Sequence, residues 1–506
     1  MPVQPRLHDE AVKGVALSLL VAGGALAVLV GPSLADALAQ AEVTDRALVE
    51  ASAGRSVAIG ALSGDGSVTE IPLELYVARV LAGEGEPDAA PAARQALAVA
   101  IRTYAMVQLG RHRREGFDLC DTVHCQVLRA ANADSRRAAL ATAGRVLAID
   151  DRPAEVFYSA SCGGRSEAAA TVWPGATFPY LQAIHEDDVH EDDEPWALEL
   201  TIDQMSEALA AAGFGGRLRA LAITAHTTSG RVDRLRLDGM RPAAIAGTAF
   251  RSALGTTRLR STAFGMTRAG DRVRFTGRGY GHGVGMCVIG AGRRARRGED
   301  VEAILAQYYP ALELADLGTL ILPGDGAFGE REVSEGGIVA RVPAGSSVSA
   351  GDLRAMAARA HETLSRTLGT SISPVIVELH PTLDDFRLDT GRPPWASAAA
   401  TGTTIDLAPA SALEARRGVS AALRTAMAEM LVAPSLADRP AWVRVGAARY
   451  FAAAVPPEPG SLPVACPADA ELTLAVSAEA QRDAEARAVQ CFARAYATTG
   501  DWRKVE

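Results

Sequence analysis

The chain has 506 residues, of which 48% are hydrophobic and 22% are charged. This composition argues against long disordered segments, and the length predicts two or three domains. Acidic residues outnumber basic ones by 60 to 51, giving a net charge of −9, which speaks against a general nucleic-acid binder. Six cysteines are too few for a disulfide scaffold, but they are enough for one metal site or one or two bridges.

An apolar segment stands near the N-terminus. Residues 14–30 are uncharged, follow Arg6 and Lys13, and precede the small-residue pattern Ala37-Leu38-Ala39, which suits signal peptidase. A stable membrane span needs about 20 apolar residues, so this segment is marginal as an anchor. We therefore predict that residues 1–39 are a signal peptide, with an uncleaved anchor as the alternative. The protein is expected in the periplasm or cell envelope.

Hydrophobic periodicity predicts a mixture of helices and strands. Gly, Pro and Asp residues between them supply the expected turns and helix ends. Expected strands lie at 57–64, 67–71, 145–149 and 154–158, and expected helices at 73–81 and 134–142, with a further helix that has Asp88 as its cap and Pro91 in its first turn.

Two glutamates, Glu84 and Glu86, fall in the Gly-containing break between the first two expected helices. A carboxylate in such a break can lie at the rim of a groove. Partial burial there would raise its pKa and allow it to act as a general acid at neutral pH. The alternative is an ordinary solvated acidic loop, and the spacing alone favours this second interpretation.

A cluster of cysteine and histidine residues follows the second expected helix: His112, Cys120, His124 and Cys125. Two thiolates and two imidazoles can form a closed tetrahedral zinc site. An exported protein meets an oxidising compartment, so a Cys120–Cys125 disulfide is a competing interpretation. A buried Cys125 thiol beside solvated histidines is a third.

A Gly-rich segment, 157–165, contains Ser159, Ser161 and Cys162, and a second one, 279–285, contains His282. A Ser or Cys nucleophile with His282 as its base is conceivable. There is no GxSxG elbow and no evident third member of a triad. Packing of a strand end against a Gly-rich loop is therefore the favoured interpretation.

An acidic run occupies residues 185–194. It could hold Ca²⁺, but it lacks the glycine spacing of an EF-hand loop, and its two histidines do not have the zinc-protease spacing. A solvated loop is the favoured interpretation.

Taken in order, segments across residues 55–325 resemble the stage II sporulation protein D family, whose domain also occurs in amidase enhancers. The resemblance implies a mixed α+β catalytic domain with a groove that binds glycan. The segments that carry the resemblance are 71–77, 82–84, 96–105, 118–121, 124–127, 154–164, Trp173, 179–181, 275–286 and 308–310.

This resemblance implies lytic transglycosylase activity on peptidoglycan glycan strands. In that family one glutamate protonates the glycosidic oxygen between N-acetylmuramic acid and N-acetylglucosamine. The same glutamate then acts as base while the C6 hydroxyl closes a 1,6-anhydro ring, so no second carboxylate is needed. Counting back from residues 102–104 places Glu84 at that position, and the longer spacing before Pro87 leaves Glu86 as an alternative.

The resemblance also implies further site residues and partners. The family's structural zinc site maps onto His112, Cys120, His124 and Cys125, and no organic cofactor is expected. Expected partners are peptidoglycan strands, with no nucleic acid. The competing function is a non-catalytic, glycan-binding enhancer of a partner N-acetylmuramoyl-L-alanine amidase, and a third hypothesis is a structural envelope protein. Expected groove residues are Arg102, Tyr104, Tyr158, Ser159, Ser161, Arg278, Tyr280 and His282.

After an expected linker at 326–337, residues 338–506 resemble a smaller α+β domain, the gluzincin-like peptidase MA domain. The segments that carry this resemblance are 375–379, Phe386, 394–395, 404–409 and 440–451. Where H-E-x-x-H is expected the chain reads Thr-Ala-Met-Ala-Glu at 425–429, and Val445 stands in place of the third metal ligand. The resemblance therefore implies an inactive protease fold. Cys466 and Cys491 could form the one bridge of this region.

Overall fold

A computed structural model describes residues 43–506, except 62–66, 113–114, 123, 174–177, 186–194, 321, 323–330, 344–345, 394, 456 and 459–464. The predicted signal segment, nearly all of the acidic run and the first half of the expected linker lie outside the described residues. The second half of that linker is wrong in part, because Arg331–Glu335 form strand β15. Among the described residues no helix is long and apolar enough to cross a membrane.

Helices and strands are mixed along the chain and form several small sheets, which confirms the predicted α+β class. Three large groups of buried side chains can be distinguished, one in each of three stretches of the fold. The first lies in residues 43–185 and 278–322, the second in an inserted body at 196–277 together with Ala470, and the third in the C-terminal region.

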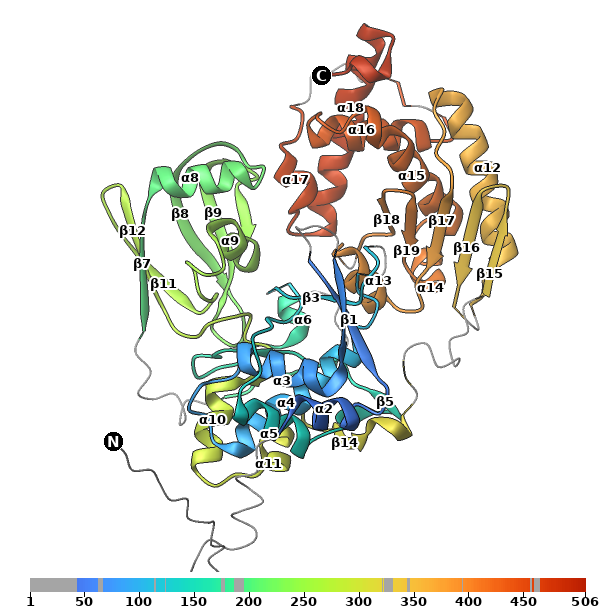
Figure 1. Ribbon diagram of the computed structural model, residues 1–506. Coiled ribbons are helices and arrows are strands. Elements are labelled where there is room, and N and C mark those ends of the chain that lie inside the picture. The colour runs from blue at the N-terminus through green and yellow to red at the C-terminus, as the bar shows by residue number, and fades with distance from the viewer. Residues whose placement is uncertain are drawn as a thin grey trace, which may run out of the picture. The chain divides into compact units, whose positions relative to one another are not determined.

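The first core is built around α4 (Pro91–Val107). Ala96 to Met106 are all buried, so α4 is covered on nearly every side, as expected of a helix that is apolar around its whole circumference. Pro91 occupies the first turn as predicted, but the N-cap is Ala90 and not Asp88. Figure 1 shows the covering helices gathered around α4. They are α3 (Leu73–Glu84), α5 (Ala133–Ala141), α10 (Val288–Arg296) and α11 (Val301–Tyr308), with α2 (Asp45–Ala51) packed on α3 and α5.

The predicted first hairpin is confirmed as the antiparallel pair β1 (Ser56–Gly60) and β2 (Val68–Pro72). β1 also pairs in parallel with β3 (Leu119–Cys120), which brings Cys120 alongside Gly60. The predicted strand 145–149 is β4 (Arg145–Ile149), paired with β14 (Glu313–Asp316) and with the short β5 (Arg152–Pro153). A strand over 154–158 is wrong, because the chain leaves β5 after Pro153 and runs buried into the core.

The two Gly-rich segments meet in a short parallel sheet. β6 (Tyr158–Ser159) pairs with β13 (Met286–Cys287), so Met286 lies opposite Tyr158. The short helix α6 (Ala169–Val172) follows β6. The expected packing of a strand end against a Gly-rich loop is therefore present.

Residues 196–277 form an inserted body that the sequence analysis does not separate from the surrounding domain. Phe250, Phe264 and Phe275 meet in its own core. Its two three-stranded sheets have the orders β10-β9-β8 and β11-β12-β7. Its elements are β7 (Trp196–Thr201), α8 (Ile202–Ala211), β8 (Gly215–His226), β9 (Val232–Arg241), β10 (Ala244–Ala246), α9 (Gly247–Leu254), β11 (Phe264–Ala269) and β12 (Arg272–Gly277).

The C-terminal region has a five-stranded sheet of order β15-β16-β17-β19-β18, with parallel central strands and an antiparallel strand at each edge. Helices α12 and α15 pack against this sheet, and α16 packs on α15. The predicted Cys466–Cys491 disulfide is present and joins α18 to the preceding chain. The elements are β16 (Ile338–Val342), α12 (Ala350–Leu368), β17 (Val375–Leu379), α13 (Leu383–Thr390), β18 (Ala398–Thr401), β19 (Thr404–Leu407), α14 (Ala410–Glu414), α15 (Val419–Val432), α16 (Ala441–Ala452), α17 (Asp469–Thr473) and α18 (Ala478–Thr499).

Candidate active site

Glu84 is the last residue of α3 and not a loop residue, because the helix continues three residues beyond the predicted end. Its Oε1 accepts a hydrogen bond from the backbone N–H of Val127 at 2.9 Å. The preceding residue must be small, because a Cβ at Gly83 would collide with the Val127 carbonyl. The end of α3 and the segment at Val127 are therefore locked closely together.

Burial raises the pKa of the Glu84 carboxyl, and this effect outweighs the Val127 N–H and the positive charge of Arg129, which both lower it. A carboxyl with a raised pKa retains its proton to higher pH than an exposed one. It is therefore suited to give a proton and then to take one back.

Three polar side chains form a relay beside Glu84. The Tyr76 hydroxyl donates to Oε1 of Gln126 at 2.7 Å, and Nε2 of Gln126 donates to the Tyr158 hydroxyl, also at 2.7 Å. Burial raises the pKa of both tyrosines, and the charge of Glu84 adds to the effect on each. Both phenols therefore stay protonated and bring no charge of their own to the neighbourhood of Glu84.

Glu86 points elsewhere. Its Oε2 is buried, and no described residue donates a hydrogen bond to it. It lies 2.5 Å from where a Cβ on Gly292 of α10 would stand, so it faces that helix. The structure thus does not bring Glu86 into the contacts that Glu84 makes with Val127.

The predicted cysteine and histidine residues come together. One ligand atom from each of His112, Cys120, His124 and Cys125 lies within 4.8 Å of the others. Nε2 of His112 is 3.3 Å from the Cys125 sulfur, and Nδ1 of His124 is 3.7 Å from both sulfurs. Both thiols are free, so the structure contains no Cys120–Cys125 bridge.

This donor set fits zinc. Two sulfurs and two imidazole nitrogens are the ligands of closed structural zinc sites. Nδ1 of His112 lies 3.7 Å from a Glu115 carboxylate oxygen, which orients Nε2 towards the cluster. The cluster ends at Cys125, and the next two residues are Gln126 and Val127, so the same stretch of chain serves the cluster and Glu84.

Two expected groove residues are placed inside the protein. Arg102 is fully buried, and its Nε donates to Glu74 Oε1 at 2.9 Å within a two-point ion pair. It also donates to the carbonyls of Arg145 and Ala139, so it joins α3, α4 and α5 and does not line a groove. Tyr104 is buried on α4, and its hydroxyl accepts from Arg111 at 3.2 Å.

The remaining expected groove residues lie along the paired Gly-rich segments. Ser159 is buried, and its Oγ has no hydrogen-bond partner among the described residues. Ser161 is buried and accepts from the N–H of Gly163. Tyr280 is 41% exposed and Arg278 is exposed, so both remain accessible to a ligand.

His282 is not arranged as the base of a nucleophile. Its Nδ1 accepts from the N–H of Val284 at 3.0 Å, and its ring packs against Trp173. Burial, together with the positive charges of Arg251 and Arg231, lowers its pKa to about 3. Among the described residues no hydrogen bond joins His282 to Ser159 or Ser161, so the geometry supports the packing interpretation of these residues.

Sequence reasoning missed the roles of Gln126, Val127 and Arg129. The segment 124–127 is part of the family resemblance, but a backbone donor and a bridging amide have no sequence signature of their own.

The fold and the site define an α+β domain that presents a partly buried carboxylate beside a cluster of two cysteines and two histidines. Residues 63–148 match a family model described as "Stage II sporulation protein", and residues 193–285 match a domain of unknown function (DUF8618). The second match covers the inserted body. Neither matched segment lies in 338–506, where the peptidase MA resemblance stays a prediction.

Curated relatives agree with the first match. The chain is 28% identical over 277 residues to stage II sporulation protein D of Bacillus amyloliquefaciens, covering 49% of this chain and 76% of that protein. It is 29% identical over 254 residues to an uncharacterized protein of Brachyspira hyodysenteriae, with 49% and 68% covered. It is 26% identical over 274 residues to an amidase enhancer of Bacillus subtilis, with 44% and 38% covered. Residues 63–148 are therefore similar to the stage II sporulation protein family, and together with the named relatives this supports a role related to the cell wall.

Proposed function

We propose that the protein is a peptidoglycan lytic transglycosylase with Glu84 as its general acid and base. The observation that supports this most directly is the Glu84 carboxyl itself. It lies half-buried at the end of α3, one oxygen is held by the Val127 N–H, and burial raises its pKa. The family resemblance and the similarity to sporulation protein D supply the substrate class.

In the proposed reaction, protonated Glu84 gives its proton to the glycosidic oxygen between N-acetylmuramic acid and N-acetylglucosamine. The carboxylate that results then takes the proton of the muramic acid C6 hydroxyl as that oxygen closes the 1,6-anhydro ring. The Val127 N–H stabilises the carboxylate between the two transfers, and the tyrosine–glutamine relay is polar without adding a charge beside it. No enzyme nucleophile or hydrolytic water is required.

We also propose that the cysteine–histidine cluster binds zinc in a structural role. The ion would crosslink β3 to residues 124–125 and so fix the position of Gln126 and Val127. Export to the cell envelope is part of the same proposal, because the substrate lies there and residues 1–39 have the pattern of a signal peptide.

The second candidate function is that of an amidase enhancer, which binds glycan without cleaving it. The similarity to the Bacillus subtilis amidase enhancer supports it. A raised carboxyl pKa is not needed for that role, so the environment of Glu84 favours the enzyme.

For the C-terminal region we propose an inactive peptidase-like domain. Thr425 and Glu429 on α15 stand where two histidine ligands are expected, and Val445 on the adjoining α16 stands in place of the third ligand. Threonine and valine do not supply the ligands of a catalytic zinc site, so the expected set of three is incomplete. Glu429 instead lies 3.3 Å from the guanidinium of Arg392.

The test compares the wild type with Glu84→Gln and with Glu86→Gln as a matched control on purified peptidoglycan. Mass spectrometry of the soluble products should detect 1,6-anhydro ends with wild type and with Glu86→Gln, but not with Glu84→Gln. Undiminished product from Glu84→Gln would refute the assignment. Stimulation of a cell-wall amidase without any product would instead support the enhancer.

A further inference from the structure

The inserted body, residues 196–277, differs in charge from the rest of the chain. It contains 12 arginines and only 6 aspartates and glutamates, whereas the whole chain has a net charge of −9. Arginine is common throughout the sequence, so the local feature is the shortage of carboxylates. Half of the arginine side chains in this body make no hydrogen bond or ion pair with a described residue: Arg219, Arg234, Arg241, Arg258, Arg260 and Arg274. The inserted body therefore carries positive charge that its own side chains do not neutralise.

Part of this charge forms a row on the outer face of β12. Burial alternates along the strand, and its exposed residues are Arg272, Arg274 and Thr276. Arg278 continues the alternation just after the strand and is exposed as well. We call Arg272, Arg274 and Arg278 the arginine row. It is about 20 Å long, because a strand advances about 3.4 Å per residue. Arg272 is paired with Glu199, and Arg274 has no such partner among the described residues.

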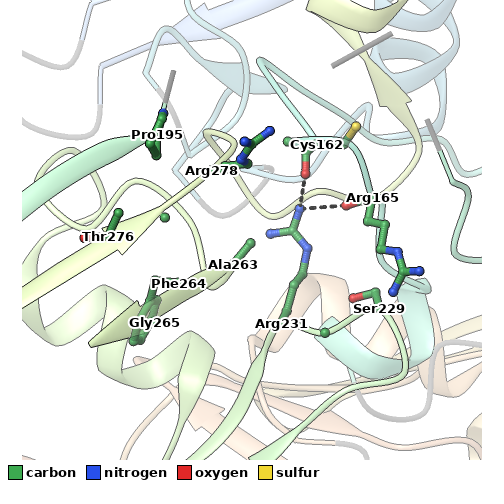
Figure 2. A pocket seen from close by; sticks show the side chains of 13 residues that line it. Cys162, Arg165, Pro195, Ser229, Arg231, Ala263, Phe264, Gly265, Thr276 and Arg278 are labelled. Carbon is green, nitrogen blue, oxygen red and sulfur yellow. Dashed lines mark hydrogen bonds between the residues drawn. The ribbon is translucent and has the colours of Figure 1, made fainter. Parts of the chain in front are cut away.

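The arginine row ends at a pocket of about 450 Å³. Thr276 and Arg278 line this pocket from the side of the row, and Arg165 and Arg231 are also part of its wall. Figure 2 shows these side chains around the pocket. None of the described residues that line it is acidic, so the wall is electropositive.

Arg231 is the unusual member of this wall. Only 1% of it is exposed, and Nη2 donates to the carbonyls of Cys162 at 2.8 Å and Arg165 at 3.1 Å. Nε and Nη1 have no hydrogen-bond partner among the described residues, and Nη1 points towards the open part of the pocket in Figure 2. Glu167 acts on Arg231 through its charge, but its carboxylate accepts from Ser229.

A purely structural role accounts for Nη2 of Arg231 but not for the rest of the guanidinium. Nη2 ties the inserted body to residues 162–165. A buried N–H without an acceptor is costly, and more so when the group is charged. Buried charges in proteins are normally paired. The Arg231 side chain thus lacks an acceptor, and an anion in the pocket would supply one.

The arrangement of the arginines favours phosphate over carboxylate, and a polymer over a single anion. Three arginines face the pocket from different elements, and the tetrahedral oxygens of a phosphate can accept hydrogen bonds from several directions. The two oxygens of a carboxylate lie in one plane. The arginine row extends the positive charge beyond the pocket, so a polymer with a charge in each repeat gains contacts that a single anion cannot make.

The face that carries the arginine row is unlike a surface for nucleic-acid bases. Thr276 lies opposite Gly265 and Ala197, and Arg274 lies opposite Thr267. A Cβ at Gly265 would meet nothing within 4 Å, so the face is open there. Among the described residues on this face of the sheet none is aromatic, and single-stranded nucleic acids bind largely by stacking their bases on aromatic side chains.

We propose that the inserted body binds a phosphodiester-linked polyol polymer, which follows the arginine row and places one phosphate in the pocket beside Arg231. This binding function is separate from glycan cleavage and does not rest on it. It would hold the protein where such a polymer lies.

Binding is measured by calorimetry on the full chain, with a short poly(glycerol phosphate) as the probe. The comparison probes are polyglutamate and oligothymidylate with the same number of charges, phosphatidylglycerol vesicles, and inorganic phosphate. Poly(glycerol phosphate) should bind about 10-fold or more tightly than each of these, and its affinity should fall as the salt concentration rises.

Three substitutions test the assigned residues. Arg274→Gln should weaken binding about threefold, as expected of an exposed charge, and Arg231→Gln should weaken it about 10-fold or more. Arg234→Gln is the matched control and should leave the affinity unchanged, because Arg234 is equally exposed and unpaired but lies on β9 of the other sheet. If circular dichroism shows that Arg231→Gln does not fold, Arg278→Gln replaces it and should also weaken binding about 10-fold.

Polyglutamate that binds as tightly as poly(glycerol phosphate) would overturn the proposal. So would a loss of affinity in Arg234→Gln as large as that in Arg274→Gln, because binding would then depend on net charge alone. Equal or tighter binding of oligothymidylate or of the vesicles would overturn the polyol assignment. None of the probes contains glycan, so these outcomes neither require nor exclude the proposed cleavage by Glu84.

Discussion

The backbone N–H of Val127 donates to Oε1 of Glu84 at 2.9 Å, and Val127 stands two residues after Cys125 of the cysteine–histidine cluster. The cluster and the carboxyl are therefore coupled through a single short stretch of backbone. Whatever fixes Cys125 also fixes the donor that holds Glu84.

Loss of the metal should therefore disturb the site as well as the fold. The purified protein is expected to contain one zinc ion per chain, and Cys120→Ser should lower both the zinc content and the melting temperature. Elemental analysis and thermal unfolding under non-reducing conditions measure this. The absence of stoichiometric zinc, with Cys120 and Cys125 oxidised, would refute the metal site.

The rate of glycan cleavage should fall as the pH rises through the raised pKa of Glu84, because only the protonated carboxyl can act as the acid. Arg129 lowers that pKa, so Arg129→Gln should raise it and move the alkaline limb of the profile to higher pH. Arg136→Gln, which removes an ion pair with Asp45 on the surface, is the control and should leave the limb in place. An alkaline limb that does not respond to Arg129→Gln would exclude Glu84 as the titrating acid.

Glu84→Gln should increase stability at neutral pH while reducing cleavage by about 10²-fold or more. A carboxyl whose pKa is raised by folding contributes its full stability below its unfolded pKa and loses it as the pH rises through the folded pKa. Glutamine avoids that loss and can still accept from Val127. Urea unfolding should show the difference at pH 7 and little difference below the unfolded pKa; a variant less stable than wild type at pH 7 would contradict the argument.

Arg102→Ala should destabilise the protein by about 3–5 kcal/mol, because it leaves the buried Glu74 carboxylate unpaired. Urea unfolding measures the loss. A variant of unchanged stability that no longer binds glycan would restore the predicted groove role.

Cys491→Ser should lower the free energy of unfolding of the C-terminal region by about 3 kcal/mol, from the loop entropy of a 25-residue separation. Differential scanning calorimetry can compare this variant with wild type treated with reductant. Because the bridge lies outside the proposed catalytic site, cleavage by the folded variant should be unchanged. A transition unaffected by the substitution would show that the bridge adds no stability.

Much of the local structure is predictable because periodicity and end signals agree with it. β1, β2, α5 and β4 lie within a few residues of expectation, and the cysteine–histidine cluster comes together as its donor types indicate. The prediction of Asp88 as the N-cap of α4 is wrong, for a physical reason. Pro91 sets the start of α4, and Ala90 then serves as the cap with no side-chain hydrogen bond.

Burial and long-range pairing account for what was not predictable. Arg102 reads as a polar groove residue, but its partner Glu74 is 28 positions away, and only the packing of α3 on α4 unites them. The boundaries of the inserted body have no distinctive composition. Arg231 likewise donates to the carbonyls of Cys162 and Arg165, and sequence alone does not place these groups beside it.

The parallel pairing of Tyr158 with Met286 has a consequence for the order of folding. The two strands are separated by the whole inserted body. During synthesis from the N-terminus, the chain therefore cannot form this sheet until residue 287 has been made. Closing so long a loop costs conformational entropy, and the few backbone hydrogen bonds of this short sheet offset that cost only once the intervening chain has folded. The surroundings of Glu84 are thus expected to form last. A fragment that ends before Met286 should contain α3 and α4 but should lack the complete site.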